Sequence, residues 1–298
     1  MHRPLRDRPA HPDGPRADCT ADSAGGLTFD IVLPGLGERW DAALLLRERG
    51  AGAPGVPDDG CVRLPLFPAV SPAGSPAAGR LRAALPSTMT LAEGHWDGFL
   101  VLGEEEPRRL RSGEHDLRSL GDREPGPHRA WLGVRIPYAG PGGGLSLRAW
   151  LRRPHAEARE VRATDAGLAL GGRLYGAEPA AGAVVEARPR PAPDGAPAPA
   201  PLTAAVTASG ADFRATLSVP YPVGTGEWDL WLRPAPEAPA VRLARLLDDV
   251  VDRHRLPPLP PHRCGDRLVT PYWTCDNDLA VRITAADAPG GGRAARER

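Results

Sequence analysis

The densest group of oxygen-bearing side chains in the sequence is Asp276-Asn277-Asp278, directly after Cys275. Carboxylate and amide oxygens at this spacing are ligands that Ca²⁺ accepts. At the matching positions of an internal repeat, described below, the chain has three glycines (142–144), which favour turns. We therefore interpret residues 275–278 as a turn between two strands, and the sequence predicts no metal site.

Other reactive side chains form no recognised catalytic set. His115-Asp116 and Asp252-x-His254 have the composition of acid–base pairs, but no nucleophile is placed beside them. The sequence contains no Lys, which excludes a Walker A phosphate loop and a pyridoxal Schiff base, and it contains no G-x-S-x-G elbow. We therefore assign no catalytic residue and expect no cofactor.

The composition limits the class of partner and the location. The 298 residues carry 37 basic and 37 acidic side chains, so we expect no nucleic-acid partner, because such binding needs excess positive charge. No apolar run approaches the roughly 18 residues of a membrane span, and residues 1–26 lack the apolar stretch of a secretory signal. The four cysteines show no CxxC spacing, so we expect a cytoplasmic protein with free thiols.

Short apolar runs of five to seven residues, separated by Gly, Pro and Asp, fill most of the chain. This pattern is typical of all-β proteins. Only Val241–Arg255 has apolar residues at helical spacing, and Pro257 ends the pattern. The sequence therefore predicts an all-β chain with one short helix or helical crossover in its second half. The polar segments 1–24 and 285–298 are predicted to be disordered.

An internal repeat sets the domain organisation. The motif Pro137-Tyr138-x6-Leu-Ser-Leu-Arg148 returns as Pro271-Tyr272-x6-Leu-Ala-Val-Arg282, with identical spacing. Upstream, Gly-His-Trp-Asp at 94–97 returns as Gly-Glu-Trp-Asp at 226–229, and Arg-Leu at 109–110 returns at 242–243. Concordant matches of this kind predict two tandem immunoglobulin-like β-sandwich modules. The predicted segments are a disordered arm (1–24), module 1 (25–142), module 2 (143–284) and a disordered tail (285–298).

Trp-Asp pairs occur at residues 40–41, 96–97 and 228–229, and a Leu lies four residues after each Trp. In a strand, this spacing puts Trp and Leu on one face and Asp on the other. We therefore predict that these Trp rings lie in the core, while the Asp side chains accept hydrogen bonds from turn amides. Trp150, Trp231 and Trp273 fall outside the pattern and are the better candidates for exposed aromatic residues.

The segments Trp228–Arg233, Arg242–Asp249 and Pro271–Arg282 resemble accessory β-sandwich modules of actinobacterial cell-envelope glycosyltransferases, which are similar to the enzymes that build or decorate teichoic-acid-like polymers. The resemblance covers residues 145–284 well and residues 25–145 more weakly. It implies that the chain holds the accessory part without the catalytic domain. It also implies a role in oligomerisation or in holding the polymer acceptor.

These observations favour a non-catalytic interaction or scaffold protein of envelope-polymer synthesis, which binds a glycopolymer or a partner glycosyltransferase. The alternative is a transferase whose arginines hold a phosphorylated substrate at the module junction. Arg135 and Arg148 flank that junction, and Arg267 and Arg282 flank the equivalent position. A third hypothesis is a dimerisation unit that pairs through an edge strand to form a homo-oligomer. The candidate binding residues are Trp231, Trp273, Arg148 and Arg282.

Overall fold

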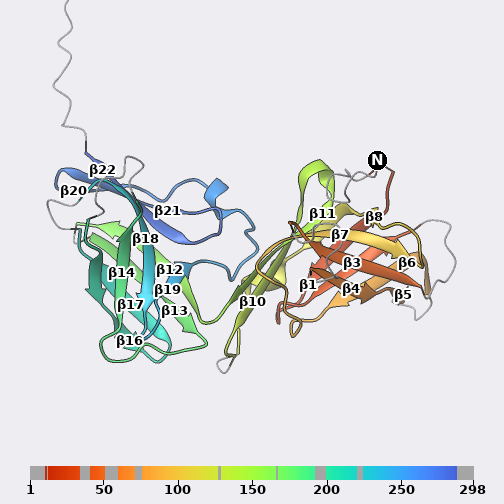
Figure 1. Ribbon diagram of the computed structural model, residues 1–298, viewed down its shortest axis with the longest axis horizontal. Coiled ribbons are helices and arrows are strands. Elements are labelled where there is room, and N and C mark those ends of the chain that lie inside the picture. Colours follow the sequence, from red (N-terminus) through yellow and green to blue (C-terminus); the bar gives the residue numbers. More distant parts are fainter. Residues whose placement is uncertain are drawn as a thin grey trace, which may run out of the picture. The chain divides into compact units, whose positions relative to one another are not determined.

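The structure is a computed structural model that describes residues 11, 13–33, 41–50, 60–70, 76–126, 129–165, 167–191, 199–219 and 224–286 (Figure 1). Strands dominate these residues, which confirms the predicted all-β class. The described residues contain one α-helix, α1 (Arg118–Gly121). Trp40 of the first Trp-Asp pair and residues 287–298 of the predicted tail lie outside the described residues.

The chain folds as two units. Unit 1 comprises Met1–Gly126, Leu132–Arg152 and Leu247–Val251, and unit 2 comprises Pro127–Trp131, Arg153–Leu246 and Asp252–Arg298. The main boundary therefore follows Arg152, rather than lying between residues 142 and 143 as expected. The reason is that β10 (Leu132–Ala139) and β11 (Leu145–Arg152) form one antiparallel hairpin of unit 1, joined by the 3-10 turn η2 (Pro141–Gly143).

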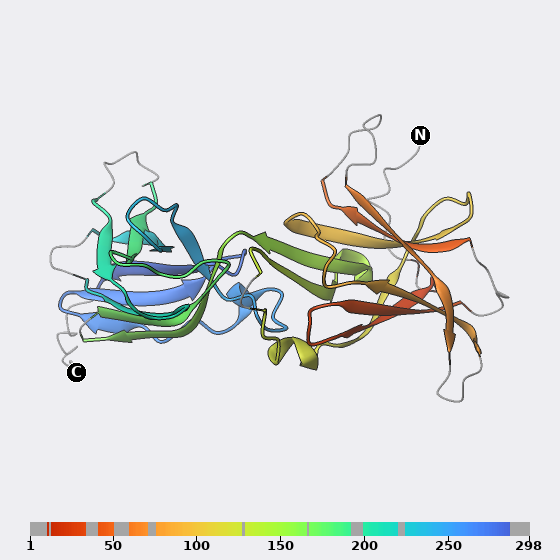
Figure 2. The same cartoon turned by 90° about the horizontal axis from the view of Figure 1, so that it is seen from below.

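Unit 1 holds two sheets. Its other strands are β1 (Arg16–Ala21), β2 (Leu27–Val32), β3 (Ala42–Glu48), β4 (Cys61–Pro65), β5 (Phe67–Val70), β6 (Pro76–Leu85), β7 (Gly94–Leu102), β8 (Arg108–Arg109) and β9 (Arg111–Asp116). One sheet has the order β5-β6-β2-β1-β9 and the other β10-β11-β7-β3-β4, and β8 pairs with β7. Figure 2 shows the strands of this unit as two layers.

Strand β1 lies within residues 1–24, for which the sequence predicted a disordered arm. Its side chains alternate between exposed and buried, and Ala17, Cys19 and Ala21 enter the core of unit 1. The strand pairs with β2 on one side and β9 on the other, so its backbone groups are satisfied on both edges. Residues 16–21 of the predicted arm are therefore an interior strand of this sheet, between β2 and β9.

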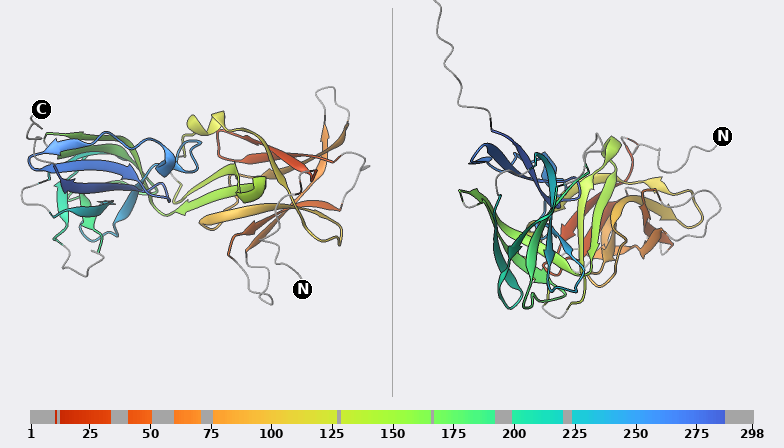
Figure 3. Two further views of the ribbon diagram at one scale, coloured as in Figure 1. Left: turned by 90° about the horizontal axis from the view of Figure 1, so that it is seen from above. Right: turned by 60° about the vertical axis from the view of Figure 1, so that its left-hand side comes forward.

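The strands of unit 2 are connected in one 11-stranded sheet. Its strands are β12 (His155–Thr164), β13 (Gly167–Tyr175), β14 (Val184–Pro189), β15 (Leu202–Ala205), β16 (Thr207–Ser209), β17 (Asp212–Leu217), β18 (Gly226–Arg233), β19 (Val241–Ala244), β20 (His262–Cys264), β21 (Arg267–Trp273) and β22 (Leu279–Ala285). They pair in the order β16-β17-β13-β12-β19-β18-β22-β21-β20, in which β19 pairs with both β12 and β18, and β14 pairs with β18 and β15. The strands of both units are also visible in Figure 3.

The two units share one topology. The antiparallel set β6-β2-β1 of unit 1 corresponds to β17-β13-β12 of unit 2, and β9 and β19 run parallel to β1 and β12. The set β10-β11-β7-β3-β4 likewise corresponds to β21-β22-β18-β14-β15. Even the register agrees, because Trp96 pairs with Leu147 as Trp228 pairs with Val281. The sequence repeat is thus a repeat of fold, while its immunoglobulin-like character stays a prediction.

The segment predicted to be helical is mostly not helical. Val241–Ala244 forms β19, and the only helical element of this segment is the three-residue 3-10 turn η3 (Arg253–Arg255). Leu243 and Leu246 are fully buried, so the apolar residues do face a core. Leu243 reaches it through a parallel pair with Ala156 of β12 rather than from a helix face.

Candidate functional site

The carboxylate of Asp97 on β7 is buried and bound by two arginines. Arg49 and Arg109 each donate from Nη2 to Asp97 Oδ1, at 2.7 and 2.8 Å, and Ser146 Oγ donates to the same oxygen at 2.8 Å. Burial acts to raise the pKa of Asp97, but the hydrogen bonds from Arg49 and Ser146 and the charge of Arg109 hold it below its ordinary value. Asp97 therefore ties together segments from β3, β8 and β11.

Asp229 on β18 is held in the same way. Arg190, directly after β14, donates from Nε and Nη2 to Asp229 Oδ1 at 2.9 and 2.7 Å, and Arg242 Nη1 lies 2.9 Å from that oxygen. Burial again opposes the two guanidinium groups, which lower the Asp229 pKa. The side chains of Asp97 and Asp229 thus bind arginines, not the turn amides that the sequence predicted, whereas Trp96 and Trp228 are buried as predicted.

Two of the predicted binding residues, Trp231 and Arg282, lie on the face of unit 2 that carries Asp229. The Trp231 ring is half-buried, and the Cζ atoms of Arg188 and Arg242 lie 4.7 and 5.0 Å from its centroid. Arg282 is exposed and donates to Glu227 Oε1 at 2.8 Å. This face is therefore a network of internal cation–π contacts and ion pairs, in which two arginines already contact the Trp231 ring.

The other predicted aromatic and arginine residues are less accessible than expected. Trp273 packs against the hydrophobic core of unit 2, with the Cζ of Arg253 5.4 Å from its ring centroid. Arg148 is buried in unit 1, and its Cζ lies 5.0 Å from the ring of Trp150. The prediction that Trp150 is exposed is wrong, because its side chain is 1% exposed.

Arg135, placed by the sequence at the expected module junction, cross-links the backbone of unit 1. Its guanidinium donates to the carbonyl oxygens of Pro86, Met89 and Gly25 at 2.9, 3.0 and 2.9 Å. Arg135 is also only 3% exposed. Arg267, which the sequence places beside the equivalent position of unit 2, forms an ion pair with Asp266 at 3.1 Å. These contacts give Arg135 a structural role rather than the substrate-holding role of the alternative hypothesis.

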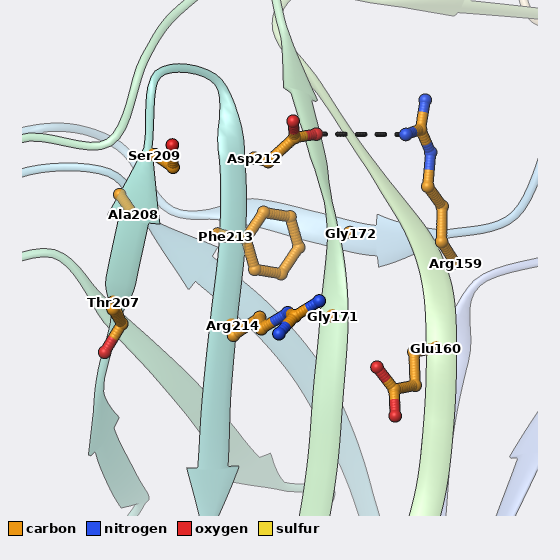
Figure 4. Close-up of a pocket in the computed structure, with 10 residues that line it drawn as sticks. All are labelled: Arg159, Glu160, Gly171, Gly172, Thr207, Ala208, Ser209, Asp212, Phe213 and Arg214. Atoms are coloured by element: carbon orange, nitrogen blue, oxygen red, sulfur yellow. Dashed lines mark ion pairs between the residues drawn. The ribbon is translucent and has the colours of Figure 1, made fainter.

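Unit 2 has an open pocket of about 550 Å³ on strands β12, β13, β16 and β17, which sequence reasoning missed (Figure 4). Gly171 and Gly172 of β13 line it at the centre, and Arg214 of β17 and Glu160 of β12 flank Gly171 from either side (Figure 4). Two glycines inside a strand often mark a place where a ligand approaches the backbone, and this was the available sequence signal. Arg159, at an irregularity in β12, also lines the pocket.

Most charged groups of this pocket have partners within unit 2. Asp212 accepts two hydrogen bonds from Arg173 Nη1, at 3.0 and 3.1 Å, and Glu160 forms an ion pair with Arg162 at 3.1 Å. Arg159 lies 3.8 Å from Asp212, and its Nη2 donates to the Tyr175 hydroxyl at 3.0 Å. The pocket and these partners together contain four arginines and two carboxylates, Glu160 and Asp212.

Arg214 differs from these residues. It is exposed, and among the described residues no carboxylate lies within ion-pair distance of it. The exposed hydroxyls of Thr207 and Ser209, on edge strand β16, line the same pocket. Such a set of guanidinium and hydroxyl groups can bind a ligand that carries an oxyanion next to hydroxyl groups of its own.

Residues 275–278 form the turn between β21 and β22, as predicted, and Asn277 has a left-handed backbone with φ of 59°. Within the described ranges, no three His, Cys, Asp or Glu side chains are grouped so that they could hold a metal ion. In the same residues, no helix has the length and apolar character needed to cross a membrane.

No protein-family model matches the chain, and no curated protein matches it. Among solved structures, a crystal structure of S. aureus TarS is 16% identical with a TM-score of 0.27, over 69% of this chain and 35% of that one. A structure of S. aureus TarS 217–571 is 15% identical with a TM-score of 0.27, over 70% of this chain and 57% of that one. The chain therefore spans only part of these TarS chains, and the structural similarity is distant.

Proposed function

We propose that this chain is a non-catalytic interaction protein of cell-envelope glycopolymer synthesis, and that unit 2 binds an anionic glycopolymer. The observation that carries the proposal is the open pocket beside Gly171, lined by the guanidinium groups of Arg159 and Arg214 and by the hydroxyls of Thr207 and Ser209. Guanidinium groups recognise the charges of such a polymer, and hydroxyls pair with those of its sugars or polyols.

The size and position of the pocket suit a repeating unit of a polymer. Its volume of about 550 Å³ lies within the usual range for small-molecule sites. It opens on the face of a sheet and reaches the edge strand β16, so a longer chain can leave it without crossing the core. Binding there requires no rearrangement of the buried side chains of unit 2.

The partners of the pocket carboxylates support a binding role over a catalytic one. Asp212 is bound by Arg173 and Glu160 by Arg162. Both pocket carboxylates are therefore ion-pair partners of arginines of unit 2, and neither is assigned the role of a general base for a hydroxyl nucleophile. The two groups instead fix the arginines that surround the site.

Co-sedimentation with native cell-envelope material tests the proposal, before and after the anionic glycopolymer is removed chemically. We expect binding that disappears with the polymer and that weakens in Arg214→Ala. Arg63→Ala is the control, because it removes an exposed arginine of unit 1 and should leave binding unchanged. Absence of binding, or binding unaffected by removal of the polymer, would contradict the proposal and leave a partner glycosyltransferase as the candidate, to be tested by affinity capture.

An assay with a nucleotide-sugar donor tests the alternative transferase directly. We expect no sugar transfer to the polymer. Transfer that is lost in Arg148→Ala or Arg282→Ala would overturn the non-catalytic proposal. Because Arg148 is buried, its variant also needs a urea unfolding curve to show that it folds.

A further inference from the structure

The duplication allows the pocket of unit 2 to be compared with the same position in unit 1. In unit 1, Phe29 of β2 pairs with Ala83 of β6, and in unit 2 Leu170 of β13 pairs with Ala215 of β17. All four side chains are buried in the core of their unit. Strands β2 and β13, and likewise β6 and β17, can therefore be aligned residue by residue.

One residue along these strands, the two units differ. In unit 1, Asp30 pairs with Arg82, and both oxygens of the Asp30 carboxylate accept hydrogen bonds from the guanidinium, at 2.8 and 2.9 Å. In unit 2, the matching residues are Gly171 and Arg214. The arginine is present in both units, but the carboxylate is present only in unit 1.

The glycine leaves room above the strand. A Cβ at Gly171 would lie 3.4 Å from Glu160 Cβ and Oε2 and 3.8 Å from Arg214 Cγ, which are ordinary contact distances. The packing therefore does not require glycine at this position. In unit 1 the Asp30 carboxylate fills the space beside the arginine. Because Gly171 has no side chain, the equivalent space in unit 2 is part of the open pocket.

We propose that this pocket is an oxyanion-binding site in which a ligand's carboxylate or phosphate group binds Arg214 as the Asp30 carboxylate binds Arg82. Two parallel N–H···O bonds from one guanidinium suit both groups, because each presents two oxygens in the required geometry. That the natural ligand is a glycopolymer rests on the proposed function. The oxyanion is then the charged group of the polymer that Arg214 binds. At the matching position of unit 1 the ion pair takes the place of such a site, because Asp30 already binds Arg82.

Neighbouring side chains complete the site. Thr207 of β16 pairs with Arg214 of β17 in the strand register, and both side chains line the pocket. Arg159, held by the Tyr175 hydroxyl, supplies a second positive charge on the other side of Gly171. The Glu160 carboxylate is bound by Arg162, which reduces its repulsion of an incoming anion.

Substitutions at Gly171 provide the test. Gly171→Asp should recreate the ion pair of unit 1 and supply the anion from the chain itself, whereas Gly171→Asn adds a side chain of nearly the same shape without the charge. Binding of inorganic phosphate, glucose 1-phosphate, glucuronic acid and glucose to the full chain is measured by calorimetry. We expect the three anions to bind the natural protein and glucose to bind at least about tenfold more weakly.

In Gly171→Asp and in Arg214→Ala, anion affinity should fall at least about tenfold, and in Gly171→Asn about threefold or less. Equal losses in the Asp and Asn variants would overturn the proposal, because they would show that bulk alone blocks the pocket. Failure of all three anions to bind the natural protein would overturn it as well. A urea unfolding curve for each variant confirms that it is folded. Binding of phosphate probes but not glucuronic acid would assign the oxyanion to phosphate, and the reverse would assign it to carboxylate.

Co-sedimentation with the polymer separates this inference from the proposed function. Anion binding that is lost in Gly171→Asp, without any polymer binding, would support the oxyanion site and contradict the glycopolymer role. Polymer binding that is equal in the natural protein and in Gly171→Asp would support the role and contradict the site.

Discussion

Asp97 and Asp229 hold the same position in the two units, and each carboxylate accepts ion pairs from two arginines. Each Asp follows a buried Trp, and in each unit one arginine directly follows the neighbouring strand while the other lies on a short strand that pairs with the Asp-bearing strand. The duplicated arrangement shows that the Asp and its arginines form one structural feature of the fold. It explains why Trp-Asp and Arg-Leu recur together along the chain.

Replacing Asp97 should destabilise the protein more than replacing Asp229. The Asp97 side chain is 10% exposed and that of Asp229 26%, and Arg109 beside Asp97 is 8% exposed. Asp97→Asn leaves a buried guanidinium without its counter-charge, so we expect a loss of about 3–5 kcal/mol in unfolding free energy. Asp229→Asn should cost less, because the Asp229 carboxylate is more exposed and both of its arginines keep a second acidic partner, Glu227 for Arg190 and Asp278 for Arg242. Urea unfolding of both variants checks this, and a larger loss for Asp229→Asn would contradict it.

Stability should fall in acid. The pKa values of Asp97, Asp229, Glu186 and Glu227 all lie below their ordinary values. For the first three, burial acts to raise the pKa, but contacts with arginines lower it by more. For Glu227, the hydrogen bond from Arg282 is the main cause of the lowering. Their stabilisation is therefore complete above the unfolded-state values of about 4 and is lost as the pH falls through the lower folded-state values.

Titration of these four carboxylates should leave the urea midpoint nearly constant between about pH 7 and pH 5. Below about pH 4 it should lower the midpoint. The decrease should be shallower in Asp97→Asn, which no longer has that titrating group. An equally steep decrease in this variant would show that Asp97 does not contribute to the acid dependence.

Gly172 and Gly171 should respond differently to substitution by alanine. A Cβ at Gly172 would overlap the carbonyl oxygen of Glu157 and lie 2.7 Å from Phe213 Cζ, whereas one at Gly171 makes only ordinary contacts. We expect Gly172→Ala to lower the unfolding free energy by about 1–3 kcal/mol and Gly171→Ala to change it by less than about 1 kcal/mol. Chemical denaturation of the two variants measures this, and similar effects would show that the strands adjust to a Cβ at either position.

The four thiols should react at different rates. Cys275 is exposed, whereas Cys19 is buried, and burial together with the nearby Asp30 charge raises the Cys19 pKa. Because the thiolate is the reactive form, we expect Cys275 to be alkylated first and Cys19 only after unfolding. Mass spectrometry of iodoacetamide-treated protein with and without urea gives the order, and Cys275→Ser serves as the control. Labelling of Cys19 in the folded protein would contradict its place in the core.

The repeat could be predicted from the sequence because equivalent hairpins keep the same number of residues between their paired positions. The Pro137 and Pro271 motifs are the same hairpin, in which Tyr138 pairs with Ser146 and Tyr272 with Ala280. The sequence predicted the boundary between the modules at the glycines before Leu145. These glycines do precede a strand, but this strand, β11, pairs with β10 and belongs to unit 1. Local turn residues indicate where strands begin and not which strands belong together.

The segment beginning at Val241 shows how pairing overrides periodicity. Leu243, Leu246 and Leu247 have helical spacing, but Leu243 lies on strand β19, which pairs with β12 in parallel and places the side chain in the core of unit 2. Only the position of β12, more than 80 residues earlier in the chain, distinguishes the two outcomes. A short apolar run does not contain that information.

The candidate site escaped prediction for the same reason. Gly171 and Arg214 are meaningful only as a pair across two strands, and Arg82 and Asp30 only as their counterpart in the other unit. The sequence instead predicted two aromatic residues and two arginines as binding residues, Trp231, Trp273, Arg148 and Arg282. Of these, Trp231 has two arginines over its ring and Trp273 packs against the core.

The difference between Asp30 and Gly171 also has an evolutionary meaning. A solvent-exposed ion pair contributes only about 0–1 kcal/mol, so one copy of a duplicated fold can lose the acidic partner and remain folded. In the copy that lacks the acidic residue, the arginine is open to selection for a contact with a ligand. Homologous proteins should then keep the arginine in both copies but vary the acidic residue only in the second, as a trace of relaxed selection after duplication.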